Sequence, residues 1–259
     1  MTIAGSDSGG GAGVTADLKT FEAHGVWGTL ALVAVTAQNT VGVQAMQVLS
    51  PELVRAQIDR VVTDIGVDAV KTGMLATAEL VAVVAEALLR HRLELVVVDP
   101  VLVSTSGDVL LADDALGALR EELMPLATVI TPNLPEASAL DGFEIVDRAG
   151  MEDAGRRLLS LGASVVMLKG GHLDGDESPD LVLGRGEQAL WIEAERLPVR
   201  HTHGTGCVLS AAIAAELAKG MSPGDACVAA KHFVAGAIAA GLELGAGVGP
   251  VDPGWAART

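Results

Sequence analysis

The stretch His203-Gly204-Thr205-Gly206-Cys207 carries the clearest chemical signal in this chain. Its two glycines allow a tight turn, and the alanine-rich run that follows predicts a helix whose positive end lies at that turn. The N–H groups of such a turn would bind an anion, and we expect the same position to stabilise the thiolate of Cys207. A plain helix start with a buried cysteine is the alternative for this segment taken alone.

Charged side chains end two apolar runs that are typical of strands buried on both faces. Asp99 follows Leu95–Val98, and Lys169 follows Val165–Leu168. In an open parallel sheet, ligands bind beyond the carboxyl ends of the strands. We therefore expect Asp99 to face a ligand or a metal, and Lys169 to have an anionic partner.

Asn133 and Glu136 follow another strand and lie three residues apart, on one face of a predicted helix. A solvated helix start capped by Asn133 is one reading. The other pairs Glu136 with Asp99 as the hard oxygen ligands that Mg²⁺ prefers. A lysine, a carboxylate pair and a turn lined by N–H groups together describe phosphoryl transfer, with Lys169 and Mg²⁺ on the donor phosphates.

The glycine-rich loop from Gly5 to Gly13 opens a helix but matches neither the G-x-G-x-x-G fingerprint nor the phosphate-binding P-loop. A Rossmann oxidoreductase is thus poorly supported. A tight turn and a ligand loop remain equally good readings. Asp17, on the following helix, is expected to face the same crevice, with an ordinary acid of the first helical turn as the alternative.

Strand-like and helix-like segments alternate along the chain, which favours a mostly parallel sheet covered on both faces. The polar and apolar mixture in 174–200 predicts a hairpin of edge strands, and no linker interrupts residues 1–259, so we expect a single α/β domain. The expected strands are Met1–Ala4, Leu30–Thr36, Ala69–Thr72, Leu95–Asp99, Thr128–Thr131 and Val165–Lys169. The expected helices are Val14–His24, Pro51–Ile65, Thr77–Arg92, Asp113–Met124, Pro135–Leu140, Met151–Leu161, Thr205–Lys219 and Pro223–Leu244.

The composition of the chain limits the classes of molecule that the protein could bind. The net charge of −16 argues against an extended nucleic-acid partner, and aromatic residues make up only 2% of the chain, which leaves little for base stacking. The cysteines, Cys207 and Cys227, form no CxxC pair and suggest reduced thiols. Neither a signal peptide nor a membrane span is indicated. We expect a cytoplasmic protein that binds no membrane.

Six motifs occur in an order that resembles the hydroxymethylpyrimidine/phosphomethylpyrimidine kinase family of thiamine biosynthesis, within the ribokinase-like superfamily. They lie at residues 4–20, 37–40, 71–74, 131–136, 169–172 and 202–207. The resemblance implies a three-layer αβα sandwich with a small edge hairpin, a homodimer, and dependence on ATP and Mg²⁺. It also implies two successive phosphorylations, first of 4-amino-5-hydroxymethyl-2-methylpyrimidine and then of its monophosphate.

The resemblance also assigns site residues. Gln38 would read the amino edge of the pyrimidine, since its amide both donates and accepts. ATP would be contacted by Lys169, Asn133 and Thr205. The metal would be held by Asp99 and Glu136. Cys207 would occupy the catalytic position. The rest of the substrate pocket would comprise Gly5, Ala12, Asp17, Thr36, Met74 and Val101, and the catalytic turn Gly204, Thr205 and Gly206. A pyridoxal or pyridoxine kinase of the same superfamily is the nearest alternative, and a non-catalytic nucleotide sensor is a more distant one.

Overall fold

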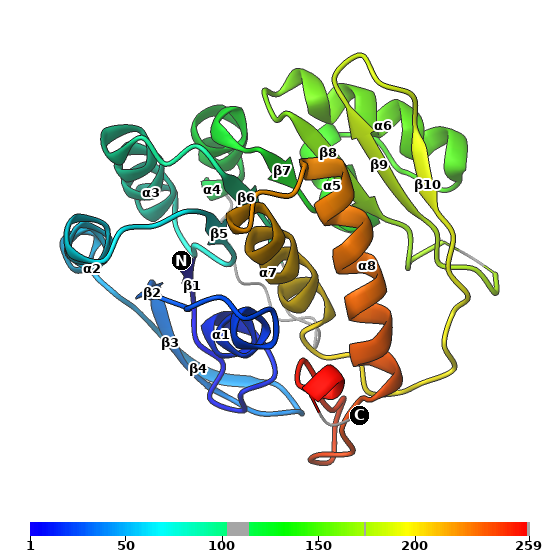
Figure 1. Cartoon of the computed structure of the whole chain (residues 1–259), viewed down its shortest axis with the longest axis horizontal. Coiled ribbons are helices and arrows are strands. Elements are labelled where there is room, and N and C mark those ends of the chain that lie inside the picture. The colour runs from blue at the N-terminus through cyan, green and yellow to red at the C-terminus, as the bar shows by residue number, and fades with distance from the viewer. Residues whose placement is uncertain (103–113, 174, 258–259) are drawn as a thin grey trace.

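A mostly parallel sheet forms the centre of the protein (Figure 1). The computed structural model describes residues 1–102, 114–173 and 175–257. Within them, eight strands pair in the order β10-β9-β8-β7-β6-β5-β1-β2. Neighbouring strands are parallel except in the pairs β8–β9 and β9–β10, so β9 alone runs against the others. These strands are β1 (Thr2–Ala4), β2 (Leu30–Leu32), β5 (Val70–Thr72), β6 (Val96–Val98), β7 (Val129–Ile130), β8 (Val165–Lys169), β9 (Asp180–Gly184) and β10 (Leu190–Ile192).

Helices cover both faces of this sheet, and α7 and α8 lie side by side across the front in Figure 1. The α-helices are α1 (Gly13–Ala23), α2 (Pro51–Asp64), α3 (Ala78–His91), α4 (Ala115–Ala118), α5 (Leu134–Asp141), α6 (Arg148–Ser160), α7 (Thr205–Ala218) and α8 (Pro223–Ala239). A short 3₁₀ turn, Trp255–Ala257, follows near the end of the described chain.

Two hydrophobic cores result, one on each face. The side chains of Val96 and Val98 belong to the core that contains α2, α3 and α6, whereas Val97 belongs to the core of α1, α7 and α8. This alternation explains why β6 reads as an unbroken apolar run: each of its faces is buried. The predicted parallel sheet with helices on both faces is confirmed, and β9 and β10 form the predicted edge hairpin.

The expected strand Leu30–Thr36 is wrong, because two separate strands occupy this segment. β2 joins the main sheet, while β3 (Ala34–Gln38) pairs with β4 (Val43–Val48) in a separate antiparallel ribbon. The break falls at Val33, whose fully buried side chain packs into the core where the chain leaves the main sheet. The β3–β4 ribbon thereby carries Gln38 away from the sheet, toward the glycine-rich loop.

The expected helix Asp113–Met124 is also only partly correct. Asp113 lies outside the described residues. After it come α4, a π-helical turn over Leu119–Leu123 and a 3₁₀ turn over Met124–Leu126. Pro125 has no N–H to donate, so an α-helix cannot continue through it undisturbed. None of the helices in the described ranges is both long enough and apolar enough to span a bilayer.

Candidate active site

Polar side chains gather at the carboxyl ends of β6, β7 and β8. The Nζ atom of Lys169 lies 3.2 Å from Asp99 Oδ1 and 3.8 Å from Glu136 Oε2. Thr131 donates its hydroxyl to Asp99 Oδ1 at 3.1 Å, and Ser210 donates to Asp99 Oδ2 at 3.2 Å. The structure thus brings together the lysine and both carboxylates that the sequence predicts at this edge.

Asn133 and Glu136 cap the start of α5 and also meet this cluster. The Asn133 side chain accepts the Glu136 N–H, and Glu136 Oε2 accepts the Asn133 N–H, each at 2.8 Å. The capping interpretation is therefore correct, although Glu136 at this helix start is buried rather than solvated. Burial raises the pKa of Glu136 to about 7 even though Lys169 opposes the change.

The first turn of α7 faces the same cluster. A Cβ placed on Gly206 would lie 3.4 Å from Lys169 Nζ and 3.6 Å from Asp99 Oδ2. Gly204 begins the helix with a φ of 84° and no side-chain cap, and the Thr205 hydroxyl donates to the Thr202 carbonyl at 2.7 Å. In the described part of the chain, the N–H groups of Gly206 and Cys207 have no backbone or side-chain oxygen acceptor. The positive end of α7 therefore opens directly onto Lys169 and the carboxylates.

Cys207 does not carry the stabilised thiolate that the sequence predicts. Burial raises the pKa of its thiol to about 11, and this outweighs the opposing effect of the Lys71 ammonium. Asp17 and Asp99 add negative charge that raises the pKa further. The side chain is consequently a neutral thiol at physiological pH.

Asp17 is buried under the site and does not form part of the crevice wall, in contrast to the prediction. Its side chain has no exposed surface, and its carboxylate binds the Lys71 ammonium and the Thr2 hydroxyl. Lys71 points into the interior from β5 and is equally inaccessible. The alternative is wrong as well, because α1 has no acidic residue in its first turn and Asp17 lies beyond that turn, on a buried face of the helix.

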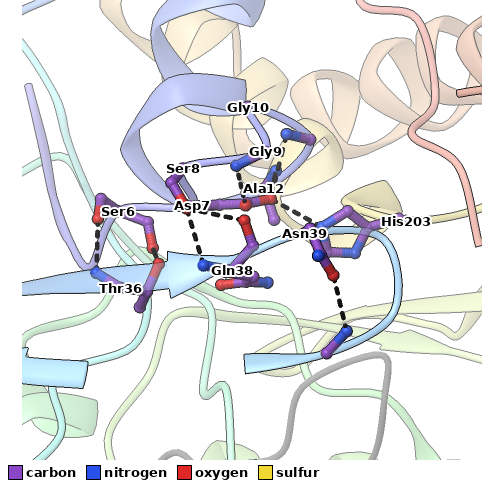
Figure 2. Close-up of polar contacts among 12 residues, drawn as sticks. Ser6, Asp7, Ser8, Gly9, Gly10, Ala12, Thr36, Gln38, Asn39 and His203 are labelled. Carbon is purple, nitrogen blue, oxygen red and sulfur yellow. Dashed lines mark hydrogen bonds and ion pairs between the residues drawn. The ribbon is translucent and has the colours of Figure 1, made fainter. Parts of the chain in front are cut away.

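The glycine-rich loop and the β3–β4 ribbon meet beside α7 (Figure 2). The hydroxyl of Ser6 accepts the Thr36 N–H at 3.0 Å, and the hydroxyl of Ser8 accepts the Gln38 N–H at 2.8 Å. A Cβ on Gly5 would overlap the terminal methyl group of Met74, so that these two expected pocket residues touch.

An open cavity of about 540 Å³ lies at this junction, and Gln38 is in its wall. Within the described residues, no hydrogen bond is made by the Gln38 side-chain amide, which is therefore available to a ligand. The lining residues are Ser8, Ala37, Gln38, Asn39, Val41, Gly42, Val43 and Gln44. Val101 follows β6, and its N–H bonds to the Asp99 carbonyl at 2.9 Å.

Three residues that organise the site were not singled out from the sequence. Asp7 binds the glycine-rich loop, Ser210 binds Asp99, and Lys71 binds Asp17. Lys71 gave a signal, since a charged side chain inside the short strand Val70–Thr72 needs a buried partner. For Ser210, the available signal is its position one helical turn after Gly206, on the same face.

Comparison with known proteins identifies the family. The phosphomethylpyrimidine kinase family model matches residues 7–252, which is nearly the whole chain. The chain belongs to this family. This membership confirms the resemblance seen in the sequence motifs.

The relatives agree with the assignment. Hydroxymethylpyrimidine/phosphomethylpyrimidine kinase of Streptomyces coelicolor is 54% identical over 256 residues, covering 99% of this chain and 94% of the relative. A crystal structure of Bacillus subtilis pyridoxal kinase with ADP has a TM-score of 0.92 at 41% identity and covers 100% of this chain and 98% of its own. Phosphomethylpyrimidine kinase of Clostridium difficile has a TM-score of 0.80 at 40% identity, covering 90% of this chain and 96% of its own. Both structures confirm the predicted fold.

Proposed function

We infer that this protein is an ATP-dependent kinase that phosphorylates 4-amino-5-hydroxymethyl-2-methylpyrimidine and then its monophosphate, giving the diphosphate used for thiamine. The observation that carries the inference is the approach of Gly206 to Lys169 and Asp99. A helix N-terminus, a mostly buried lysine and two carboxylates close to one another suit phosphoryl transfer. The name of the Streptomyces coelicolor relative supplies the substrate.

Each group has a distinct task in this proposal. The Lys169 ammonium neutralises donor phosphate oxygens, and Asn133 and Thr205 flank the nucleotide. The N–H groups of Gly206 and Cys207 stabilise the charge that develops on the transferred group. Because Cys207 is a neutral thiol, we assign it to shaping this N–H-lined space rather than to taking the hydroxyl proton.

Asp99 and Glu136 would hold Mg²⁺. The described residues contain no group of three or more side chains that could bind a metal by themselves. Two carboxylates nevertheless fit this ion, which usually binds one or two carboxylates together with substrate phosphates and water. When bound, Mg²⁺ would neutralise the donor phosphates.

The substrate lies, in this proposal, between the glycine-rich loop and the β3–β4 ribbon. The Gln38 amide meets the ring edge, since a pyrimidine with an amino group presents both a donor and an acceptor. Met74 and Gly5 form an apolar floor, with Ala12 and Thr36 nearby. The buried Asp17 acts from below, through Lys71, and does not touch the ligand.

Phosphorylation of pyridoxal is the second candidate. The Bacillus subtilis pyridoxal kinase shares this fold over 98% of its own chain, and pyridoxal also carries a hydroxymethyl group on an aromatic ring. Gln38 favours the pyrimidine because its amide matches an amino-bearing edge.

A coupled assay of ADP release separates these candidates when hydroxymethylpyrimidine, its monophosphate and pyridoxal are offered separately. We expect turnover of both pyrimidines, with pyridoxal slower or inert. Turnover of pyridoxal alone would overturn the proposal.

We also propose that the protein is a cytoplasmic homodimer without a nucleic-acid partner. The two cysteines are unpaired, the chain is strongly acidic, and the β3–β4 ribbon exposes apolar side chains, including Val35, Val41 and Met46. Light scattering after gel filtration would give a mass near twice 26.3 kDa for the dimer. A mass near that of a single chain at every protein concentration tested would contradict the proposed homodimer.

A further inference from the structure

The Asp7 carboxylate gathers N–H groups from two parts of the chain that are far apart in sequence. Oδ1 accepts the Gly9 N–H at 2.8 Å, while Oδ2 accepts the Gly11 and Ala12 N–H groups at 3.1 and 2.9 Å. His203 Nε2 lies 2.8 Å from the same Oδ2 atom (Figure 2). Asp7 therefore links the glycine-rich loop to the residue that precedes the turn at the start of α7.

The two loops also interlock sterically. A Cβ on Gly204 would overlap the Gly11 carbonyl oxygen, and a Cβ on Gly11 would lie 2.6 Å from His203 Cδ2. On its other side, the His203 backbone pairs with Gly249 and Val251. The Asp7–His203 contact thus lies in a tightly packed junction of three segments, where a shift of one loop displaces the next.

Both side chains are buried, which makes their contact stronger than a surface pair. The side chains of Asp7 and His203 are 2% and 10% exposed. Burial acts to raise the pKa of Asp7, but the hydrogen bonds from His203 and the Gly9 and Ala12 N–H groups outweigh it and lower the pKa below its usual value. The carboxylate is therefore ionised and held from several directions.

We propose that Asp7 and His203 are positioning residues that couple the substrate loop to the phosphoryl-transfer turn. The loop presents Ala12 toward the pyrimidine, and the turn presents the N–H groups of Gly206 and Cys207 toward the transferred group. This inference rests on the proposed function. The contact fixes the distance between acceptor and anion site, and a small misplacement of reacting groups is costly in rate.

Hydrogen exchange measures the coupling without turnover. In His203→Ala, we expect faster exchange in the peptide covering residues 7–12, although the substitution is in another segment. In Asp7→Asn, we expect faster exchange at residues 204–208. His203→Gln retains an N–H donor near the same place and should restore much of the protection. Exchange that changes only around the substituted residue, with no difference between His203→Ala and His203→Gln, would overturn the proposal.

Kinetics provide the second readout. We expect His203→Ala and Asp7→Asn each to lower kcat/KM for hydroxymethylpyrimidine by about tenfold to a hundredfold, with KM for ATP changed less than about twofold. The double variant should lose little more than Asp7→Asn alone, because the Asp7 substitution already disrupts the contact that His203→Ala removes. The coupling is contradicted if the fold-losses in kcat/KM of the two single variants multiply in the double variant. It is also contradicted if KM for ATP rises by as large a factor as kcat/KM falls.

Asp147→Asn is the matched control. Asp147 accepts the Gly150 N–H at 2.8 Å at the start of α6, so this change also removes an aspartate that caps backbone N–H groups. We expect lower thermal stability with unchanged exchange at residues 7–12 and 204–208. If the wild type fails to turn over the pyrimidine, the proposed function fails, while the exchange result still tests the coupling. If His203→Ala or Asp7→Asn does not fold, His203→Gln takes its place. Hydrogen exchange at residues 7–12 and kcat/KM for hydroxymethylpyrimidine are then measured in His203→Gln and compared with the wild type.

Discussion

The Nζ atom of Lys71 lies 2.9 Å from each carboxylate oxygen of Asp17, and neither side chain has any exposed surface. The Thr2 hydroxyl donates to the same carboxylate at 2.6 Å. Asp17 raises the pKa of Lys71 despite the opposing effect of burial, so the lysine stays charged. This pair places a fixed cation and its counter-ion beneath Cys207.

Removing one partner of this pair should destabilise the fold strongly. We expect Asp17→Asn to lower the free energy of unfolding by about 3–5 kcal/mol, because it leaves the Lys71 charge buried without its counter-ion. Urea denaturation measures the loss. Glu86→Gln, in the exposed Arg55–Glu86 pair, is the control and should lower the free energy of unfolding far less, because solvent screens this pair. Similar decreases in the free energy of unfolding for Asp17→Asn and Glu86→Gln would show that the buried pair contributes no more to stability than the exposed one.

The thiol of Cys207 should react only at high pH. Its pKa of about 11 leaves roughly one thiolate in a thousand at pH 8. We expect the rate of alkylation by iodoacetamide, followed by mass spectrometry of the Cys207 peptide, to rise up to about pH 11. The Cys227→Ala background removes the other cysteine. A midpoint near the ordinary value of about 8.5 would contradict the assignment of a neutral thiol.

Replacement of Cys207 tests the same point in the reaction. A thiolate base would matter more for the first phosphorylation, whose acceptor is a neutral hydroxyl, than for the second, whose acceptor is already an anionic phosphate. A neutral thiol cannot take that proton, so we expect Cys207→Ala to lower kcat of both steps by similar factors. Steady-state rates with each pyrimidine decide this, and a loss confined to the first step supports the base.

Gly206→Ala should reduce catalysis while leaving the fold intact. The added methyl group would sit within contact distance of Lys169 Nζ and Asp99 Oδ2, in the space that the transferred phosphoryl group needs. We expect kcat/KM to fall by at least about tenfold, in line with disturbed anion stabilisation, and the melting temperature to stay near that of the wild type. Gly224→Ala, at the start of α8, meets no atom within 4 Å and should change neither quantity much. Full activity of Gly206→Ala would place the reaction elsewhere.

The demand for Mg²⁺ should depend on pH through Glu136. The ionised carboxylate binds the metal, and the pKa of about 7 means that this form is lost as the pH falls through neutrality. We expect the Mg²⁺ concentration for half-maximal rate to rise as the pH is lowered from about 8 to 6. Glu136→Gln should need more Mg²⁺ and show a flatter dependence on pH. An unchanged dependence in Glu136→Gln would remove this residue from the metal site.

Local patterns predicted the main sheet and its helices because each buried strand reads as a short apolar run. The exposed ribbon escaped prediction: β4 has the sequence VQAMQV, and its four central residues are all exposed between two partly buried valines, so no alternating pattern marks the strand. Nothing between Leu32 and Ala34 marks the break, since no glycine or proline is present. The split is set by packing of Val33 in the core, which is a tertiary effect.

Pairings across the site were harder to predict than its members. Lys169 and Asp99 could be placed together because both end parallel strands. The partner of Lys71 lies 54 residues away on a helix, and the partner of Asp7 lies 196 residues away. Such contacts depend on how α1 and α7 pack on the sheet. The thiolate prediction for Cys207 failed for the same reason, because burial cannot be judged from a turn alone.

We expect one site, which contains Lys169, to carry out both successive phosphorylations. The most direct test is a time course with hydroxymethylpyrimidine, ATP and Mg²⁺ in one vessel, with products followed by mass spectrometry. We predict that the monophosphate appears first and is then consumed as the diphosphate accumulates, and that Lys169→Met slows both steps. Absence of both phosphorylated pyrimidines, or unchanged rates in Lys169→Met, would contradict two phosphorylations at this site.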